Sequence, residues 1–73
     1  MNIEHIFMSK ASGYGHFEIK GRINGEWVKV ITTNSEAFDY INDDDNPEKQ
    51  AEALQYCKRR LEMAYNYNKN IMQ

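Results

Sequence analysis

The side chains that most often perform chemistry are few in this chain, and their spacing does not form a catalytic pattern. Cys57 is the single cysteine, and His5 and His16 are the only histidines. Cys57 falls on the apolar stripe of a predicted helix, where a thiol is usually buried and unreactive. Both histidines fall on predicted strands, and nothing in the sequence brings either of them to the cysteine. The residues therefore predict a protein that is not an enzyme.

Two short motifs carry the residue types of ligand sites but lack the residues that would complete them. The acidic run at residues 43–46 suggests calcium, yet counting from Asp43 places Glu48 and Leu54 where an EF-hand loop needs glycine and glutamate. The glycines of residues 13–16 lead into a strand, and no Lys-Ser/Thr pair follows them, so a phosphate loop is not supported. We predict no cofactor and no metal ligands, with a weak cation site at residues 43–45 as the alternative to a solvated helix start.

A β-hairpin is the strongest local pattern. Residues 16–23 and 26–33 flank Asn24-Gly25, which tolerates the two positive φ angles of a type I′ turn. This turn sets the register, with Gly21 facing Val28 and Ile19 facing Val30 on an apolar side. The opposite, outer side then carries His16, Glu18, Lys20, Arg22, Trp27, Lys29, Ile31 and Thr33.

The remaining segments predict one strand before the hairpin and two helices after it. Residues 2–8 read as a strand whose two sides are both partly apolar, so its inner face stays open. Thr33 to Glu36 fits a T-x-x-E capping box, which predicts a short helix over residues 34–42 with Ala37, Phe38 and Ile41 inward.

A longer helix is expected from Pro47, because Asn46 can cap it and proline suits the first helical position. Asparagines compete with helical hydrogen bonding after Tyr65, so residues 66–73 are expected to fray. The predicted inner stripe is Ala51, Leu54, Cys57 (or Lys58), Leu61, Ala64 and Tyr65. The result is one α+β domain over residues 1–73, with a three-stranded antiparallel sheet and both helices packed on one face.

Composition narrows the class of protein. The chain has 73 residues, a formal net charge of −2 and one cysteine, so no internal disulfide can form and a reducing cytoplasm is expected. No apolar run exceeds three residues, whereas a membrane span needs about 20 and a signal peptide about 7–15. The acidic balance weakly opposes general nucleic-acid binding.

Two sets of residues are candidates for contact with partners. On the outer side of the hairpin, Arg22 faces Trp27 as a cation–π pair, and Lys20 faces Lys29 as a repulsive pair that an acidic partner would relieve. The plainer interpretation is that these cations only keep an open sheet face soluble. The first set is Lys20, Arg22, Trp27, Lys29 and Ile31. The second set is Tyr56, Met63 and Tyr67, which form either the rim of a small core or a homodimer interface.

Residues 13–19, Asn24-Gly25 and residues 31–35 resemble a pattern found in small, uncharacterised proteins from bacteriophages and mobile elements of gut bacteria. In size, acidity and strand-rich beginning, the chain also looks like phage-encoded anti-CRISPR proteins. That resemblance implies a non-catalytic binder that occludes a host complex. Residues 49–53 and 58–61 are similar to the last helix of double-stranded RNA-binding domains, although the first helix of that family is absent and the acidic residues before Pro47 would repel phosphates.

These observations favour a small cytoplasmic protein that binds another protein through the outer side of the hairpin. The alternative is nucleic-acid binding by the same side, with Trp27 stacking on a base and the cations contacting phosphates. A structural homodimer through the second set of residues is the third hypothesis.

Overall fold

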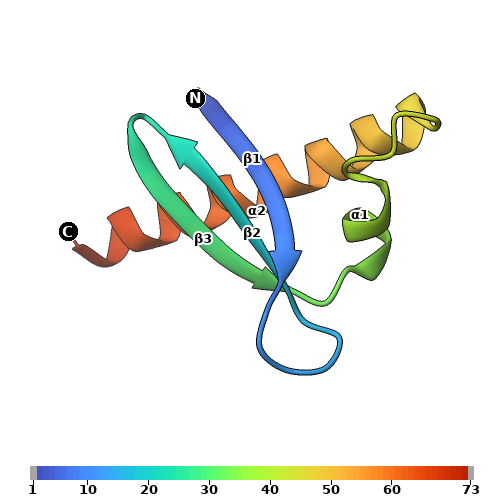
Figure 1. The fold of residues 1–73 in the computed structure, drawn as a ribbon. Helices are drawn as coiled ribbons and strands as arrows, with labels where there is room; N and C mark the ends of the chain where they lie inside the picture. The colour runs from blue at the N-terminus through green and yellow to red at the C-terminus, as the bar shows by residue number, and fades with distance from the viewer. Residues whose placement is uncertain (1, 73) are drawn as a thin grey trace.

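The computed structural model describes residues 2–72, with side chains for residues 2–67. A three-stranded antiparallel sheet forms one layer and two helices form the other (Figure 1). The order is β1 (Ile3–Lys10), β2 (Phe17–Ile23), β3 (Glu26–Thr32), α1 (Ser35–Tyr40) and α2 (Pro47–Met72). The predicted α+β architecture is confirmed, with β2 in the centre of the sheet and α2 in contact with all three strands.

The hairpin forms as its sequence predicts. Asn24 and Gly25 have φ angles of 51° and 86°, as a type I′ turn requires. The register is also confirmed, because Gly21 pairs with Val28 and Arg22 pairs with Trp27. A two-residue turn fixes the pairing register, so alternate side chains of β2 and β3 lie on opposite faces of the sheet.

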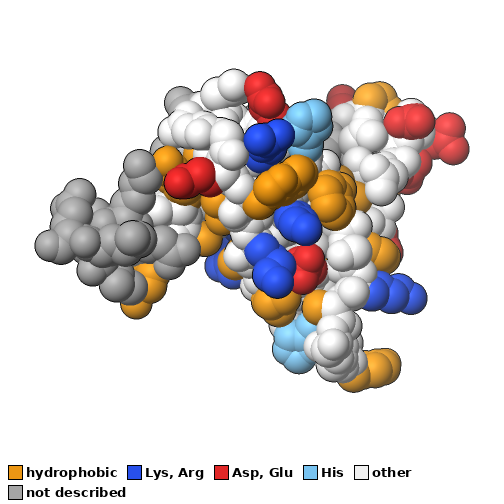
Figure 2. Space-filling model, turned by 60° about the vertical axis from the view of Figure 1, so that its left-hand side comes forward, with side chains coloured by type: hydrophobic (Ala, Val, Ile, Leu, Met, Phe, Trp, Pro, Cys, Tyr) orange, Lys and Arg blue, Asp and Glu red, His pale blue; other side chains and the backbone are white. Residues whose placement is uncertain are grey.

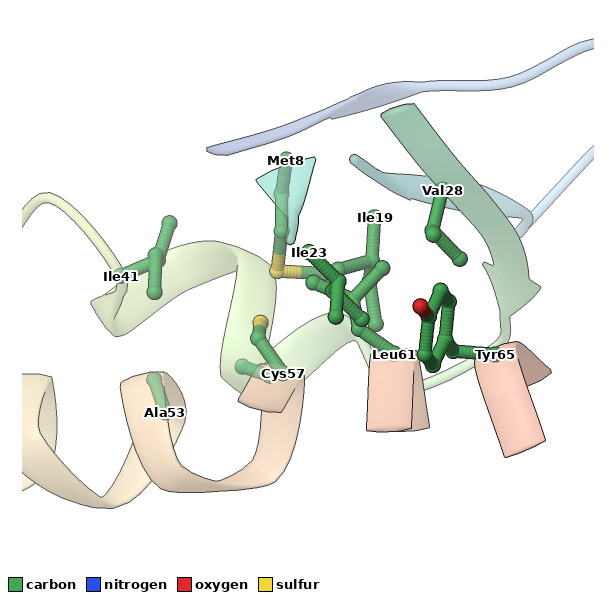
Figure 3. Close-up of a cluster of buried hydrophobic side chains, with 10 residues drawn as sticks. Met8, Ile19, Ile23, Val28, Ile41, Ala53, Cys57, Leu61 and Tyr65 are labelled. Carbon is green, nitrogen blue, oxygen red and sulfur yellow. The ribbon is translucent and has the colours of Figure 1, made fainter. Parts of the chain in front are cut away.

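The core lies between the sheet and α2 (Figure 3). Ile19 and Ile23 of β2 and Cys57 and Leu61 of α2 have no exposed surface. Gly21 lets the layers approach, since a Cβ atom there would lie 2.7 Å from Leu61 Cδ1. Among the residues whose side chains are described, the buried apolar cluster is Met8, Ile19, Ile23, Val28, Ala37, Ile41, Ala53, Cys57, Leu61 and Tyr65.

The inner stripe of α2 begins at a different alanine from the predicted one. Ala51 is exposed, and Ala53 is buried in its place. Ala53, Cys57, Leu61 and Tyr65 follow one another at intervals of four residues, which places them in one row that runs obliquely along the helix. Both alanines are small and apolar, so hydrophobicity alone could not choose between them.

The end of α2 also differs from the prediction. Residues 66–73 were expected to fray, but the backbone of α2 continues to Met72. The side chains beyond residue 67, and Gln73 itself, lie outside the described residues.

The start of α1 also differs from the prediction. Asn34, rather than Thr33, is the N-cap residue, and its Oδ1 accepts a hydrogen bond from the Ala37 amide at 3.0 Å. Thr33 is exposed, and its neighbour Thr32 accepts a hydrogen bond from the Asn34 amide. Asparagine and threonine are both good caps, so the helix starts one residue later than the capping-box pattern indicates.

A β-bulge in β1 decides which side chains of this strand are buried, a point that the sequence left open. The register shifts between Glu4 and Phe7, so that His5 and Ile6 together face Gly21. His5 has a φ of 56° at this bulge. The extra residue reverses the alternation, so Ile3 and Met8 both face the helices while Phe7 points to the other side.

Candidate binding surface

The face of the sheet that the helices do not cover carries three of the six large exposed apolar side chains of the described residues. Trp27 is 52% exposed, Ile31 45% and Phe7 43%. Figure 2 shows basic and hydrophobic side chains lying next to one another near the centre of this view. We call this surface the open face and define it by Phe7, Lys20, Arg22, Trp27, Lys29 and Ile31.

Trp27 of the open face contacts two cations that both come from β2. Lys20 Nζ is 5.4 Å from the centroid of the indole ring, and Arg22 Cζ is 5.7 Å from it. The Arg22 guanidinium also donates to the carbonyl oxygen of Gly25 through Nε and Nη2, each at 3.4 Å. The predicted cation–π pair is therefore confirmed, and Lys20 adds a second one. These contacts hold the indole in place while leaving half of it accessible to a partner.

Two aromatic side chains from β1 extend this cluster. The Phe7 ring meets Trp27 edge-on at 6.4 Å, and the His5 ring lies 6.3 Å from the same indole. Neither residue was predicted to lie on this surface, because the periodicity of residues 2–8 left open which side of the strand is buried. The available signal was that both sides of residues 2–8 contain apolar residues, which is typical of a strand that changes phase at a bulge.

The charges of the open face are poorly compensated within the protein. Lys20 and Lys29 are paired across β2 and β3, as predicted. Within the described residues, no carboxylate lies within 4.0 Å of the charged groups of Lys20, Arg22 or Lys29. Glu18 lies on the same side of β2, opposite Ile31, but does not form an ion pair with them. The face is thus both apolar and cationic, and like charges directly opposite one another are unfavourable.

The second predicted set lies on α2, away from the open face. Tyr56 belongs to the rim of the core, since its hydroxyl and the Thr32 hydroxyl form a 2.6 Å hydrogen bond. Met63 and Tyr67 are 62% and 65% exposed. The structure therefore does not unite Tyr56 with the other two in one exposed patch, and the homodimer stays a prediction.

The remaining candidates for chemistry are separated from one another. Burial raises the pKa of the Cys57 thiol to about 11, which keeps it protonated and weakly nucleophilic. His16 is exposed, and its Nδ1 lies 3.1 Å from the Tyr14 carbonyl oxygen. Among the described residues, no three His, Cys, Asp or Glu side chains are arranged to hold a metal ion, and no helix is long and apolar enough to cross a bilayer.

One small cavity lies between α1 and α2. Its volume is about 210 Å³. Lys49 enters it from α2, forms an ion pair with Glu52 at 3.8 Å, and lies 6.0 Å from the Tyr40 ring. The charge of the Lys49 amine is thus already compensated by the Glu52 carboxylate. The lining residues are Asn34, Glu36, Ala37, Tyr40, Lys49, Glu52, Ala53 and Tyr56.

Comparisons with protein-family models, curated proteins and solved structures give no match to this chain. The open face is therefore interpreted from its own chemistry.

Proposed function

We propose that this protein binds a partner protein through the open face and performs no chemistry of its own. The observation that supports this is Trp27, a half-exposed indole on the uncovered face of the sheet that contacts two cations of β2. Tryptophan and arginine dominate the binding energy of protein interfaces, particularly where they occupy the centre of the contact. Phe7 and Ile31 provide apolar area on either side of this anchor.

A protein partner fits the charge of the molecule better than a nucleic acid does. Residues 36–52 carry seven acidic side chains and one basic one, and the whole chain has a net charge of −2. Such a distribution repels a polyanion over much of the surface. It also orients a protein partner whose own charges are uneven, because the basic open face and the acidic segment favour opposite sides of it.

A binder without chemistry acts by occupying a surface that its partner needs for something else. We therefore propose that the protein is a modulator or inhibitor of a cytoplasmic complex, as the resemblance to small phage-encoded inhibitors implies.

Nucleic-acid binding is the second candidate, and one observation favours it. Phe7 and Trp27 stand on an open sheet next to Lys20 and Arg22. Aromatic side chains on a sheet surface flanked by cations are the arrangement on which single-stranded bases stack.

Affinity capture with a matched pair of variants tests the proposal. The chain is immobilised as wild type, Trp27→Ala and Tyr14→Ala, and each is exposed to cell lysate with and without nuclease treatment. Tyr14 is a fully exposed aromatic residue in the loop between β1 and β2, so its loss controls for general stickiness. We expect wild type and Tyr14→Ala to retain the same protein partner and Trp27→Ala to lose it.

Two results would contradict the proposal. Capture that survives Trp27→Ala removes the open face from the interface. Capture that disappears after nuclease treatment, together with micromolar binding to generic single strands that weakens steeply with salt, favours the nucleic-acid candidate instead.

A further inference from the structure

The outer edge of β3 is open along most of its length. Residues that flank a two-residue turn exchange backbone hydrogen bonds with each other, and such pairs then alternate along the ladder. In β3, alternate residues from Glu26 to Thr32 therefore bond to β2, while Trp27, Lys29 and Ile31 direct their N–H and C=O groups away from the sheet. Within the described residues, only the Ile31 carbonyl of this row has a partner, the Arg60 Nη2 at 3.1 Å.

The other edge of the sheet is less suited to pairing. β1 is interrupted by the bulge at His5 and Ile6, and His5 has a positive φ. A bulge breaks the regular row of donors and acceptors that a further strand needs. The register of β3, in contrast, is regular from Glu26 to Thr32.

Side chains of α2 extend beneath the open edge of β3. Tyr56 contacts Thr32, and Arg60 contacts Ile31, so this side of the helix faces β3. Met63 and Tyr67 continue the same side at helical spacing and are exposed. Figure 1 shows α2 passing behind β3 and projecting beyond its outer edge. A strand added next to β3 would therefore have an apolar floor.

Charge identifies the kind of strand that fits. Within the described residues, Lys20, Arg22, Lys29 and Arg60 form no ion pair, and the buried Nε of Arg60 has no acceptor. A second copy of β3 would bring a second set of the same cations to this edge, with a lysine in the middle of each strand. Lysine at such a position discourages pairing between identical edges. An acidic segment would relieve the repulsion between Lys20 and Lys29 instead.

We infer that the partner presents an extended acidic segment that pairs with β3 as a fourth strand. Its backbone bonds to Trp27 and Lys29, its carboxylates lie near Lys20 and Lys29, and its apolar side chains cover Met63 and Tyr67. This inference rests on the proposed function and specifies its partner. It follows the general mode in which backbone pairing gives affinity and alternate side chains give specificity.

Backbone amide exchange measures strand addition directly. The probe is a capped peptide of about eight residues in which Glu and Val alternate. Peptides of the same composition with all Glu before all Val, and with Lys in place of Glu, are the controls. We expect the alternating peptide to slow exchange at the Trp27 and Lys29 amides about tenfold and the controls to leave it unchanged. No binding by the alternating peptide at about 1 mM would overturn the inference.

Two substitutions at one position separate backbone pairing from charge. Lys29→Thr and Lys29→Pro both remove the amine, but only proline removes the outward N–H, and proline is tolerated on edge strands where that N–H faces solvent. We expect Lys29→Pro to bind the alternating peptide about tenfold more weakly than Lys29→Thr. Equal affinities would overturn strand addition. If Lys29→Pro does not fold, the exchange measurement on wild type decides.

Two further outcomes distinguish an acidic fourth strand from a second copy of this chain and from binding by the open face alone. Exchange at Trp27 and Lys29 that slows with protein concentration in the absence of peptide would replace the acidic segment with a second copy. Loss of lysate capture in Trp27→Ala, combined with unchanged amide exchange in the presence of the peptide, would leave the open face as the interface and reject the fourth strand.

Discussion

The two sides of the β2–β3 hairpin differ in what they do with apolar residues. On the inner side, Ile19, Ile23 and Val28 are buried against α2. On the outer side, Trp27 and Ile31 are about half exposed, although both are at least as large as the residues inside. Hydrophobic burial explains the inner side, and it gives no reason for placing the single tryptophan on the outer one.

Space explains which residues can occupy the inner side. Gly21 lies opposite Val28, and the gap above it is filled by Leu61 of α2. An indole at this level of the sheet would separate the two layers, because protein interiors are closely packed. The inner side therefore determines stability, while the apolar area of the outer side stays exposed.

Truncation of Leu61 should separate the two sides most clearly. Leu61→Ala removes a fully buried side chain and should lower the free energy of unfolding by about 2–5 kcal/mol. Since a domain of this size holds only about 3–5 kcal/mol, the variant should be partly unfolded at room temperature. Ile31→Ala is the matched control on the outer side and should cost under about 1 kcal/mol. Urea unfolding measures the stability of both variants. Equal losses of unfolding free energy would refute the claim that the inner side, and not the outer side, determines stability.

The pH dependence of stability should show whether water is excluded from the Cys57 thiol on the inner side. The Cys57 pKa rises from 9.0 to about 11 on folding, so its contribution is complete below pH 9 and is lost as the pH rises through 11. Wild type should lose roughly 2–3 kcal/mol more than Cys57→Ala across this interval. Other groups also titrate there, so the difference between the two proteins is the quantity to measure. Parallel profiles would show that the thiol is hydrated.

A methyl group at Gly21 should test how closely the two layers approach. Gly21→Ala places a Cβ atom 2.7 Å from Leu61 Cδ1 and 3.4 Å from Ile6 Cγ1, at a buried position. We expect a loss of about 1–3 kcal/mol in thermal or urea unfolding. A neutral or stabilising effect would mean that Leu61 can move aside, and that the layers are less tightly packed than described.

Charge reversal at Lys29 should change the two properties of the outer side in opposite directions. Lys29→Glu replaces a repulsive pair with Lys20 by an attractive one, which should stabilise the fold by about 0.2–1 kcal/mol. The same change should weaken binding to an acidic partner. Lys10→Glu, an exposed substitution at the end of β1, is the control for net charge. A Lys29→Glu variant that is less stable and binds equally well would contradict both expectations.

The hairpin was predictable because Asn24-Gly25 fixes the turn and the turn fixes the register. The five residues of the open face that belong to β2 and β3 followed from this register alone. β1 was less predictable, because the bulge at His5 and Ile6 depends on how the strand fits over Gly21 and Leu61, which are distant in sequence. For that reason, the contributions of His5 and Phe7 to the Trp27 cluster became visible only in three dimensions.

The placement of small residues also required the structure. Ala51 and Ala53 have the same hydrophobicity, and only the direction in which α2 crosses the sheet decides which of them is buried. Met63 and Tyr67 could be assigned to the helix but not to the open edge of β3, because that assignment depends on Tyr56 and Arg60 contacting the end of the strand.

Quenching of tryptophan fluorescence tests most directly whether the partner covers the open face, since Trp27 is the single tryptophan of this chain. The signal of the partner alone is subtracted. Acrylamide titrations are performed on the folded protein alone and after addition of the captured partner. We expect acrylamide to reach the indole readily in the free protein and the partner to shield it. An indole that is already shielded in the free protein, or that stays equally accessible in the complex, would contradict this expectation.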